Sequence, residues 1–163
     1  MIDILAKKFR QKGILIDTNL LILLLVGSYN EDMISSFKRT TNYVVEDYRY
    51  LKVFLTGFEK HFYTPNILTE ITNLTDTINI APNFSFFQHV KYMLSAFKEE
   101  NISSDEIMQL KSFLKFGLTD AVNCKLSDKY LVLTDDLRLC SYLESQGLPA
   151  INFNHIRNFY LFT

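Results

Sequence analysis

The chain has 163 residues, of which 48% are hydrophobic and 21% are charged, the usual composition of a globular protein. This length suffices for one domain with a core, and we expect a single domain over residues 1–163. The net charge of −1 excludes a general polyanion binder with a strongly basic surface. Two divalent cations bound by four acidic side chains would raise the charge to about +3, so charge alone does not exclude a nucleic-acid substrate.

The chain carries no sign of export or membrane insertion. Residues 1–10 lack the basic region, apolar core and small-residue cleavage site of a signal peptide. The longest apolar run, Leu20–Val26, is far shorter than the roughly 20 residues that a transmembrane helix needs. Cys124 and Cys140 form no CxxC pair, and we expect buried, reduced thiols. The sequence therefore predicts a cytoplasmic protein.

Hydrophobic spacing predicts the elements of the first third of the chain. Residues 2–12 have helical spacing and precede a fully apolar strand, Ile14–Ile16. Leu20–Val26 predicts a buried helix that ends at Gly27-Ser28. Residues 28–60 are expected to be a helical insertion that contains a pair of helices.

The rest of the chain alternates between strand and helix patterns. A short strand is expected at 62–64, and Asn66 is a candidate N-cap for a helix that ends at Leu74. Residues 76–84 predict a loop, and Gly147 predicts a left-handed helix end. The remaining helices are expected at 86–99, 104–115, 120–126 and 137–146, with Thr119 as the candidate N-cap of the third. The remaining strands are expected at 130–133 and 149–153. This alternation predicts an α/β fold, a three-layer α/β/α sandwich with a small parallel sheet.

Four acidic residues lie in apolar surroundings instead of solvated charge runs: Asp17, Glu70, Asp120 and Asp136. Asp17 follows a buried strand directly, where an uncompensated carboxylate is costly. Glu70 also fits an ordinary solvated helix position, and Asp120 fits the favourable start of a helix. Together, however, they supply the oxygen ligands that Mg²⁺ and Mn²⁺ prefer. We therefore expect a divalent-cation site at the carboxyl edge of the sheet.

The segments around these acids resemble the motifs of the PIN domain, a metal-dependent ribonuclease fold that includes the toxins of VapBC-type toxin–antitoxin pairs. The matching segments are Ile16–Asn19, Ile67–Ile71, Leu118–Ala121 and the Thr-x-Asp motif Thr134–Asp136. They occur in the family's order across nearly the whole chain. The helix at 2–12 and the insertion at 28–60 are additions to the compact toxins.

The resemblance implies an endoribonuclease that cleaves RNA phosphodiester bonds with one or two Mg²⁺ or Mn²⁺ ions. It implies that the catalytic and metal-binding residues are Asp17, Glu70, Asp120 and Asp136. It implies that the supporting or substrate-contacting residues are Thr18, Asn19, Thr134 and Asp135. The Thr-x-Asp spacing selects Asp136 over Asp135 as the ligand, and we expect one acid of this pair to cap the following helix while the other faces the metal.

The resemblance also implies partners. A toxin of this kind is silenced by a protein antitoxin and forms a homodimer. The apolar segment between Tyr43 and Phe58 occupies more than one helical face, which predicts self-association or capture by a partner. The candidate RNA-contacting residues are basic: Lys7, Lys8, Arg10, Lys12, Lys38, Arg39 and Arg138.

Three other functions stay open. One is a housekeeping RNA-processing nuclease, and another is a catalytically silent PIN module that binds RNA or protein, although all four acids are retained. A phosphatase with an aspartyl nucleophile would normally carry a second acid at the position of Asn19.

Overall fold

A five-stranded, all-parallel sheet forms the centre of the computed structural model, which describes residues 2–79 and 85–161. The strands, in the spatial order β3-β2-β1-β4-β5, are Lys98–Glu99, His61–Tyr63, Ile14–Ile16, Leu131–Thr134 and Ala150–Asn152. The chain leaves β1 for β2 on one side and later reaches β4 on the other side. The direction of winding thus reverses at β1, and open α/β sheets bind ligands outside the carboxyl ends of strands at such a point.

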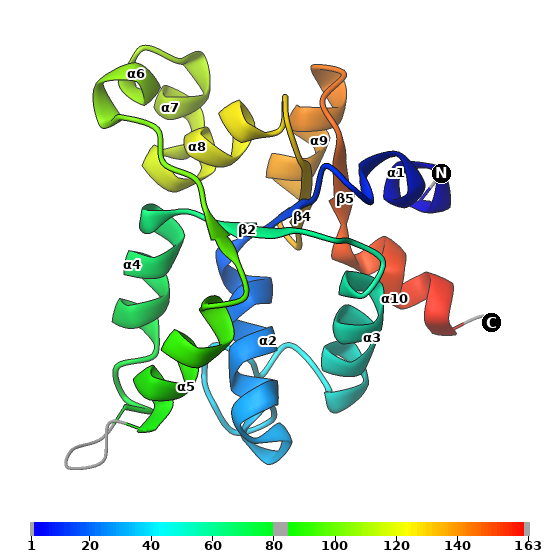
Figure 1. Ribbon diagram of the computed structural model, residues 1–163, viewed down its shortest axis with the longest axis vertical. Helices are drawn as coiled ribbons and strands as arrows, with labels where there is room; N and C mark the ends of the chain where they lie inside the picture. The colour runs from blue at the N-terminus through cyan, green and yellow to red at the C-terminus, as the bar shows by residue number, and fades with distance from the viewer. Residues whose placement is uncertain (1, 80–84, 162–163) are drawn as a thin grey trace.

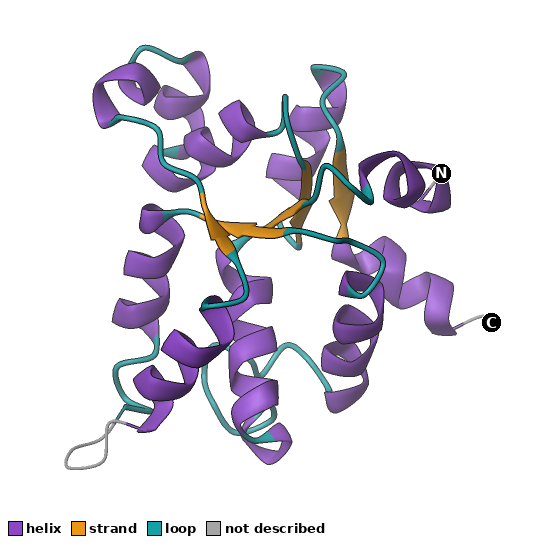
Figure 2. Ribbon diagram, viewed as in Figure 1, coloured by secondary structure: helices purple, strands orange, loops and turns teal. Residues whose placement is uncertain are grey.

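Helices cover both faces of this sheet (Figures 1 and 2). On one side in this view lie α2 (Thr18–Tyr29), α3 (Val45–Leu55), α4 (Pro65–Leu74) and α5 (Ser85–Leu94), and on the other lie α8 (Leu118–Leu126) and α9 (Leu137–Ser145). The remaining helices are α1 (Ile2–Phe9), a 3-10 turn (Glu31–Met33), α6 (Ser104–Met108), α7 (Lys111–Phe116) and α10 (Phe153–Leu161). The predicted α/β sandwich is confirmed. In the described parts of the chain, every helix is too short or too polar to cross a bilayer.

The core is built around β1 and α2. All three residues of β1 are completely buried, and α2 is buried on every side from Leu20 to Val26. A helix that is apolar all round belongs in the interior, and α2 contacts α3, α4, α5 and β4. This packing holds the junction between β1 and α2 in place.

The prediction that this helix ends at Gly27-Ser28 is wrong by one residue, because α2 continues to Tyr29. A Cβ atom at Gly27 would lie 2.5 Å from Cδ2 of Tyr48, which is buried on α3. Gly27 therefore allows α2 and α3 to approach closely instead of ending the helix.

Several predicted boundaries are also wrong. The first helix of the expected pair in 28–60 is replaced by the 3-10 turn and further turns, which the Thr40 hydroxyl stabilises by donating to the Ile34 carbonyl at 2.8 Å. The expected helix at 86–99 stops at Leu94, and Lys98–Glu99 pairs with β2 as an edge strand. The expected helix at 104–115 is split into α6 and α7, and α10 was not predicted.

Smaller predictions fared differently. The N-cap of α4 is Thr64, not Asn66, because the Thr64 hydroxyl accepts the Ile67 N–H at 3.2 Å and Pro65 takes the first helical position. Gly147 has a φ of +70°, which confirms the left-handed helix end. Cys124 and Cys140 are buried free thiols, as expected. Of the loop predicted at 76–84, residues 80–84 lie outside the described residues.

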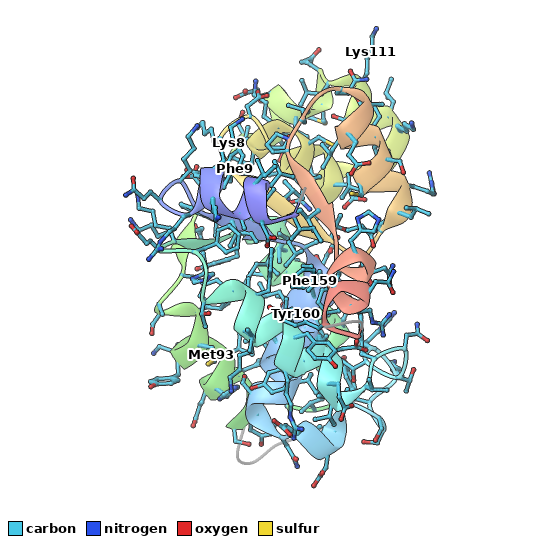
Figure 3. All side chains as sticks on the ribbon, turned by 90° about the vertical axis from the view of Figure 1, so that its right-hand side faces the viewer. Lys8, Phe9, Met93, Lys111, Phe159 and Tyr160 are labelled. Carbon is cyan, nitrogen blue, oxygen red and sulfur yellow. The ribbon has the colours of Figure 1, made fainter. Side chains whose placement is uncertain are left out.

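The C-terminal helix α10 covers part of the apolar surface of α3. The ring of Tyr160 on α10 stacks on the ring of Tyr50 on α3, with 5.0 Å between the ring centroids. Figure 3 shows Phe159 and Tyr160 on α10 beside α3. The apolar residues of the segment Tyr43–Phe58 are therefore shared between the core and α10, which was absent from the sequence prediction.

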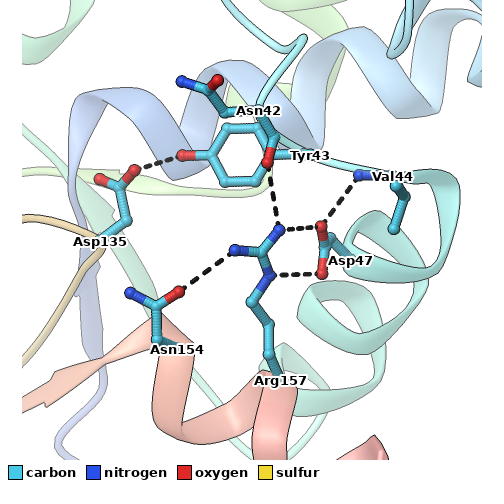
Figure 4. A network of polar contacts seen from close by, with 7 residues as sticks. All are labelled: Asn42, Tyr43, Val44, Asp47, Asp135, Asn154 and Arg157. Atoms are coloured by element: carbon cyan, nitrogen blue, oxygen red, sulfur yellow. Dashed lines mark hydrogen bonds and ion pairs between the residues drawn. The ribbon is translucent and has the colours of Figure 1, made fainter.

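An ion pair with a buried carboxylate and a partly exposed arginine also joins α10 to α3 (Figure 4). The Arg157 Nε donates to the Asp47 Oδ1 at 2.6 Å, and the Arg157 Nη2 donates to the Asp47 Oδ2. The Asp47 carboxylate is 3% exposed and also accepts the Val44 N–H at 2.9 Å, at the start of α3. Both carboxylate oxygens are thus hydrogen-bonded in the interior.

Tyr43 extends this network to the carboxyl end of β4. The Arg157 guanidinium lies 5.6 Å from the Tyr43 ring centroid, and the Tyr43 hydroxyl donates to Asp135, which follows β4 (Figure 4). Burial, followed by the Asp135 charge, raises the pKa of Tyr43, so the phenol keeps its proton and stays a donor. Helices α3 and α10 therefore help to position Asp135.

We predict that Arg157→Ala lowers the free energy of unfolding by about 3 kcal/mol, because it leaves the Asp47 carboxylate buried without a cation. Urea denaturation measures the loss. The control is Arg49→Ala, which removes an exposed ion pair with Glu31 (2.8 Å) and should cost less than about 1 kcal/mol. Equal, small losses in the two variants would show that the buried pair does not stabilise the fold.

Candidate active site

A cleft of about 390 Å³ is lined by all four predicted acidic residues: Asp17, Glu70, Asp120 and Asp136. Asp17 follows β1, Glu70 lies on α4, Asp120 lies in the first turn of α8, and Asp136 caps α9. The other lining residues are Thr18, Asn19, Leu74, Phe116, Gly117, Leu118 and Thr119. Four elements that are distant in sequence thus bring four carboxylates to one cleft.

Asp17 is held by three hydrogen bonds. As the N-cap of α2, its Oδ1 accepts the Thr18 N–H at 2.8 Å and also Nδ2 of Asn123 at 3.1 Å. Its Oδ2 accepts the hydroxyl of Thr134 at 2.6 Å. Burial raises the pKa of Asp17 to about 6, while the hydrogen bonds from Thr134 and Thr18 oppose that rise. A carboxylate has about four lone-pair sites, so Oδ2 keeps one of them for a further ligand.

Glu70 bridges the starts of α2 and α8. Its Oε2 accepts the Thr18 hydroxyl at 2.6 Å, and its Oε1 accepts the Thr119 hydroxyl at 2.5 Å. The sequence prediction made Thr119 the N-cap of α8, but the N-cap is Gly117, whose φ of +83° suits glycine. This frees the Thr119 side chain to hold Glu70, a role that the sequence analysis missed.

Asp120 has fewer hydrogen-bond donors than the other three acids. Among the described residues, no group donates a hydrogen bond to its carboxylate, although it is more than half buried. Burial raises the pKa of Asp120 to about 7, and the charges of Asp17, Asp136 and Glu70 add to the rise. The nearby Arg138 opposes it. The four carboxylates therefore lie close enough to repel one another.

The pair Asp135–Asp136 does not divide its roles as predicted. The Asp136 Oδ1 accepts the N–H groups of Arg138 at 2.7 Å and Leu139 at 3.1 Å, so Asp136 caps α9 and also lines the cleft. Asp135 instead accepts the hydroxyl of Tyr43 and, at 3.2 Å, the Asn19 side-chain amide. Asp136 thus has both expected roles, and Asp135 accepts hydrogen bonds from neighbouring side chains instead.

Asn123 is a site residue that the sequence analysis missed. It lies completely buried on α8, three residues after Asp120, and its Nδ2 donates to Asp17. Its Oδ1 is buried without a hydrogen-bond partner in the part of the chain that the structure describes. The signal was an amide inside the otherwise apolar run Ala121–Cys124, since buried polar side chains need a partner.

The donor set fits a hard divalent cation. Asp17, Asp120 and Asp136 each keep lone pairs that no described residue uses, and all the donors are oxygen atoms. In residues 2–79 and 85–161, no three Asp, Glu, His or Cys side chains are already grouped as a metal site. Carboxylates repel each other until a cation offsets their charge, so small side-chain movements toward a bound ion are expected.

We predict that, in a chelator, the free energy of unfolding falls between pH 5 and pH 8 because of Asp17 and Asp120. Their folded pKa values of about 6 and 7 exceed the ordinary 3.8, so the folded state binds more protons in this window. This stabilisation is complete below about pH 4 and is lost as the pH rises through 6 and 7. Asp120→Asn should reduce this decrease in the free energy of unfolding and should stabilise the protein at pH 8.

Urea denaturation at both pH values measures this, with the exposed Asp76→Asn as a control that should follow the wild type. If Asp120→Asn also followed the wild type, the carboxylate repulsion in the cleft would be disproved.

Comparison of the sequence with known protein families found no matching family, and comparison with curated proteins found no match.

Proposed function

We propose that the protein is a Mg²⁺- or Mn²⁺-dependent endoribonuclease that hydrolyses RNA phosphodiester bonds. The observation that carries this proposal is the single cleft lined by Asp17, Glu70, Asp120 and Asp136 at the carboxyl edge of the sheet. The resemblance of the four acidic segments to PIN-domain motifs supports the same chemistry. RNA is proposed as the substrate because of this resemblance.

When bound, one or two such ions would polarise the phosphate, lower the pKa of a water molecule and stabilise charge on the leaving oxygen. Asp17, Asp120 and Asp136 would hold the ions through their unused lone pairs. Asn123 and Thr134 keep the Asp17 carboxylate in one orientation. Such supporting hydrogen bonds orient ligands and tune their affinity for a metal.

Glu70 has a different position from the other three acids. Both of its oxygens accept threonine hydroxyls, from Thr18 and Thr119, and each oxygen retains a lone pair. We infer that Glu70 acts as a ligand through water or directly, held across the cleft by α2 and α8. Thr18 has a structural role in this arrangement, because its backbone and its hydroxyl serve two different carboxylates.

We further propose that the protein is a toxin that acts in the cytoplasm and is inhibited by a protein antitoxin. The antitoxin and a homodimer stay predictions, as does the alternative of a housekeeping nuclease.

We predict that the purified chain cleaves a fluorescent single-stranded RNA in Mn²⁺ and not in EDTA. Asp120→Asn removes a ligand without removing a protein hydrogen bond. Asp136→Ser removes a ligand but keeps a side chain that caps α9 well. The rate of RNA cleavage by each variant should fall by at least roughly 10- to 100-fold, which is the effect of removing supporting groups at metal sites.

Asp76→Asn is the matched control, since it removes an exposed carboxylate outside the cleft and should cleave like the wild type. Activity of Asp120→Asn and Asp136→Ser within a few-fold of the wild type would rule out this mechanism.

A further inference from the structure

An aromatic side chain lies in the same cleft as the acids. Phe116, the last residue of α7, lines the cleft and is partly exposed. Its ring packs against that of Tyr142 on α9, with 5.1 Å between the centroids and 59° between the planes. The turn at Gly117, with its positive φ, ends α7 here and begins α8.

Two exposed cations flank these rings. The Lys115 Nζ lies 5.1 Å from the Phe116 centroid and 4.7 Å from the Tyr142 centroid, and the Arg138 Cζ lies 5.8 Å from the Phe116 centroid. Within the described residues, neither cation forms an ion pair with a carboxylate within 4.0 Å. Both positive charges therefore stay available to an anionic ligand.

Each of the two contacting rings lines a hollow of the surface. Phe116 lines the acidic cleft, and Tyr142 lines a second cleft of about 340 Å³ that is also lined by Lys125, Gln146 and Asp128. An extended chain that leaves the acidic cleft across these rings would meet both aromatic rings and the two cations before it reached the second cleft.

We propose that Phe116, Tyr142, Lys115 and Arg138 form a binding site for single-stranded nucleic acid, with a base on the rings and phosphates beside the cations. Aromatic rings with flanking basic groups bind single strands in this way, because every base has a face that can stack. RNA and DNA share this chemistry. The inference rests on the proposed function only in that the bound strand would lead to the acidic cleft.

The test measures binding apart from cleavage. A fluorescent RNA of about 12 nucleotides, and a DNA of the same sequence, are titrated with the protein in EDTA while anisotropy is recorded. The variant Lys115→Gln/Phe116→Leu should bind at least about fivefold more weakly, since stacking and phosphate contacts are both removed. Arg138→Gln, on a different helix, should weaken binding and reduce the salt dependence by about one phosphate contact.

The chain offers a control, because Lys91 and Tyr92 are also a lysine followed by an aromatic residue, on helix α5. Tyr92 is 76% exposed, and Lys91→Gln/Tyr92→Leu should bind like the wild type. Weaker binding by the variants of RNA alone, of DNA alone or of both identifies which nucleic acid the site binds. No binding by the wild type, or binding by Lys115→Gln/Phe116→Leu that equals that of the wild type, overturns the proposal.

Failure of this site and failure of the proposed function give different results. A protein that binds through these residues but does not cleave RNA in Mn²⁺ keeps the binding site and loses the nuclease. A protein that cleaves RNA, while both variants bind and cleave like the wild type, keeps the nuclease and loses the binding site.

Discussion

The structure depends on one carboxylate kept in the interior at the end of its central strand. Asp17 is 7% exposed, and burial of a charge costs several kcal/mol unless hydrogen bonds compensate it. Three donors from three elements supply that compensation: the Thr18 N–H, Asn123 on α8 and Thr134 on β4. The positions of α2, α8 and β4 around β1 are therefore tied to a single polar group.

The same compensation leaves the cleft with excess negative charge. Glu70 and Asp136 are partly satisfied by hydroxyl and backbone donors. Among the described residues, no group donates a hydrogen bond to the Asp120 carboxylate, and the charge of Arg138 opposes the repulsion from its acidic neighbours. A fold gains nothing in stability from this repulsion, and clustered groups with strongly shifted pKa values are typical of functional sites. The Tyr43 hydroxyl and the Asn19 amide engage Asp135 beside this cluster.

The parts of the fold that sequence predicted are those with strong local patterns. The fully apolar strands predicted at 14–16 and 130–133, and the acids that follow them, could be placed because buried parallel strands have continuous apolar sequences. The edge strand Lys98–Glu99 could not, since it is short, charged and exposed. The close packing of Gly27 against Tyr48 depends on a contact that no local pattern reveals.

The sequence predicted the acidic residues of the site, but it did not predict all the residues that donate hydrogen bonds to them. Thr119 and Asn123 were hidden because their roles depend on side chains 49 and 106 residues away, Glu70 and Asp17. Asp136 combines capping with lining of the cleft because its two oxygens can face different groups, which spacing alone does not show.

The central claim is that these four carboxylates hold a hard divalent cation, and crystals grown with Mn²⁺ test it most directly. Anomalous scattering at the manganese edge should show one or two peaks in the cleft, within coordination distance of Asp17, Asp120 and Asp136, and no peak there in Asp120→Asn crystals. A cleft without manganese at millimolar concentration, or manganese bound only elsewhere, would contradict the account.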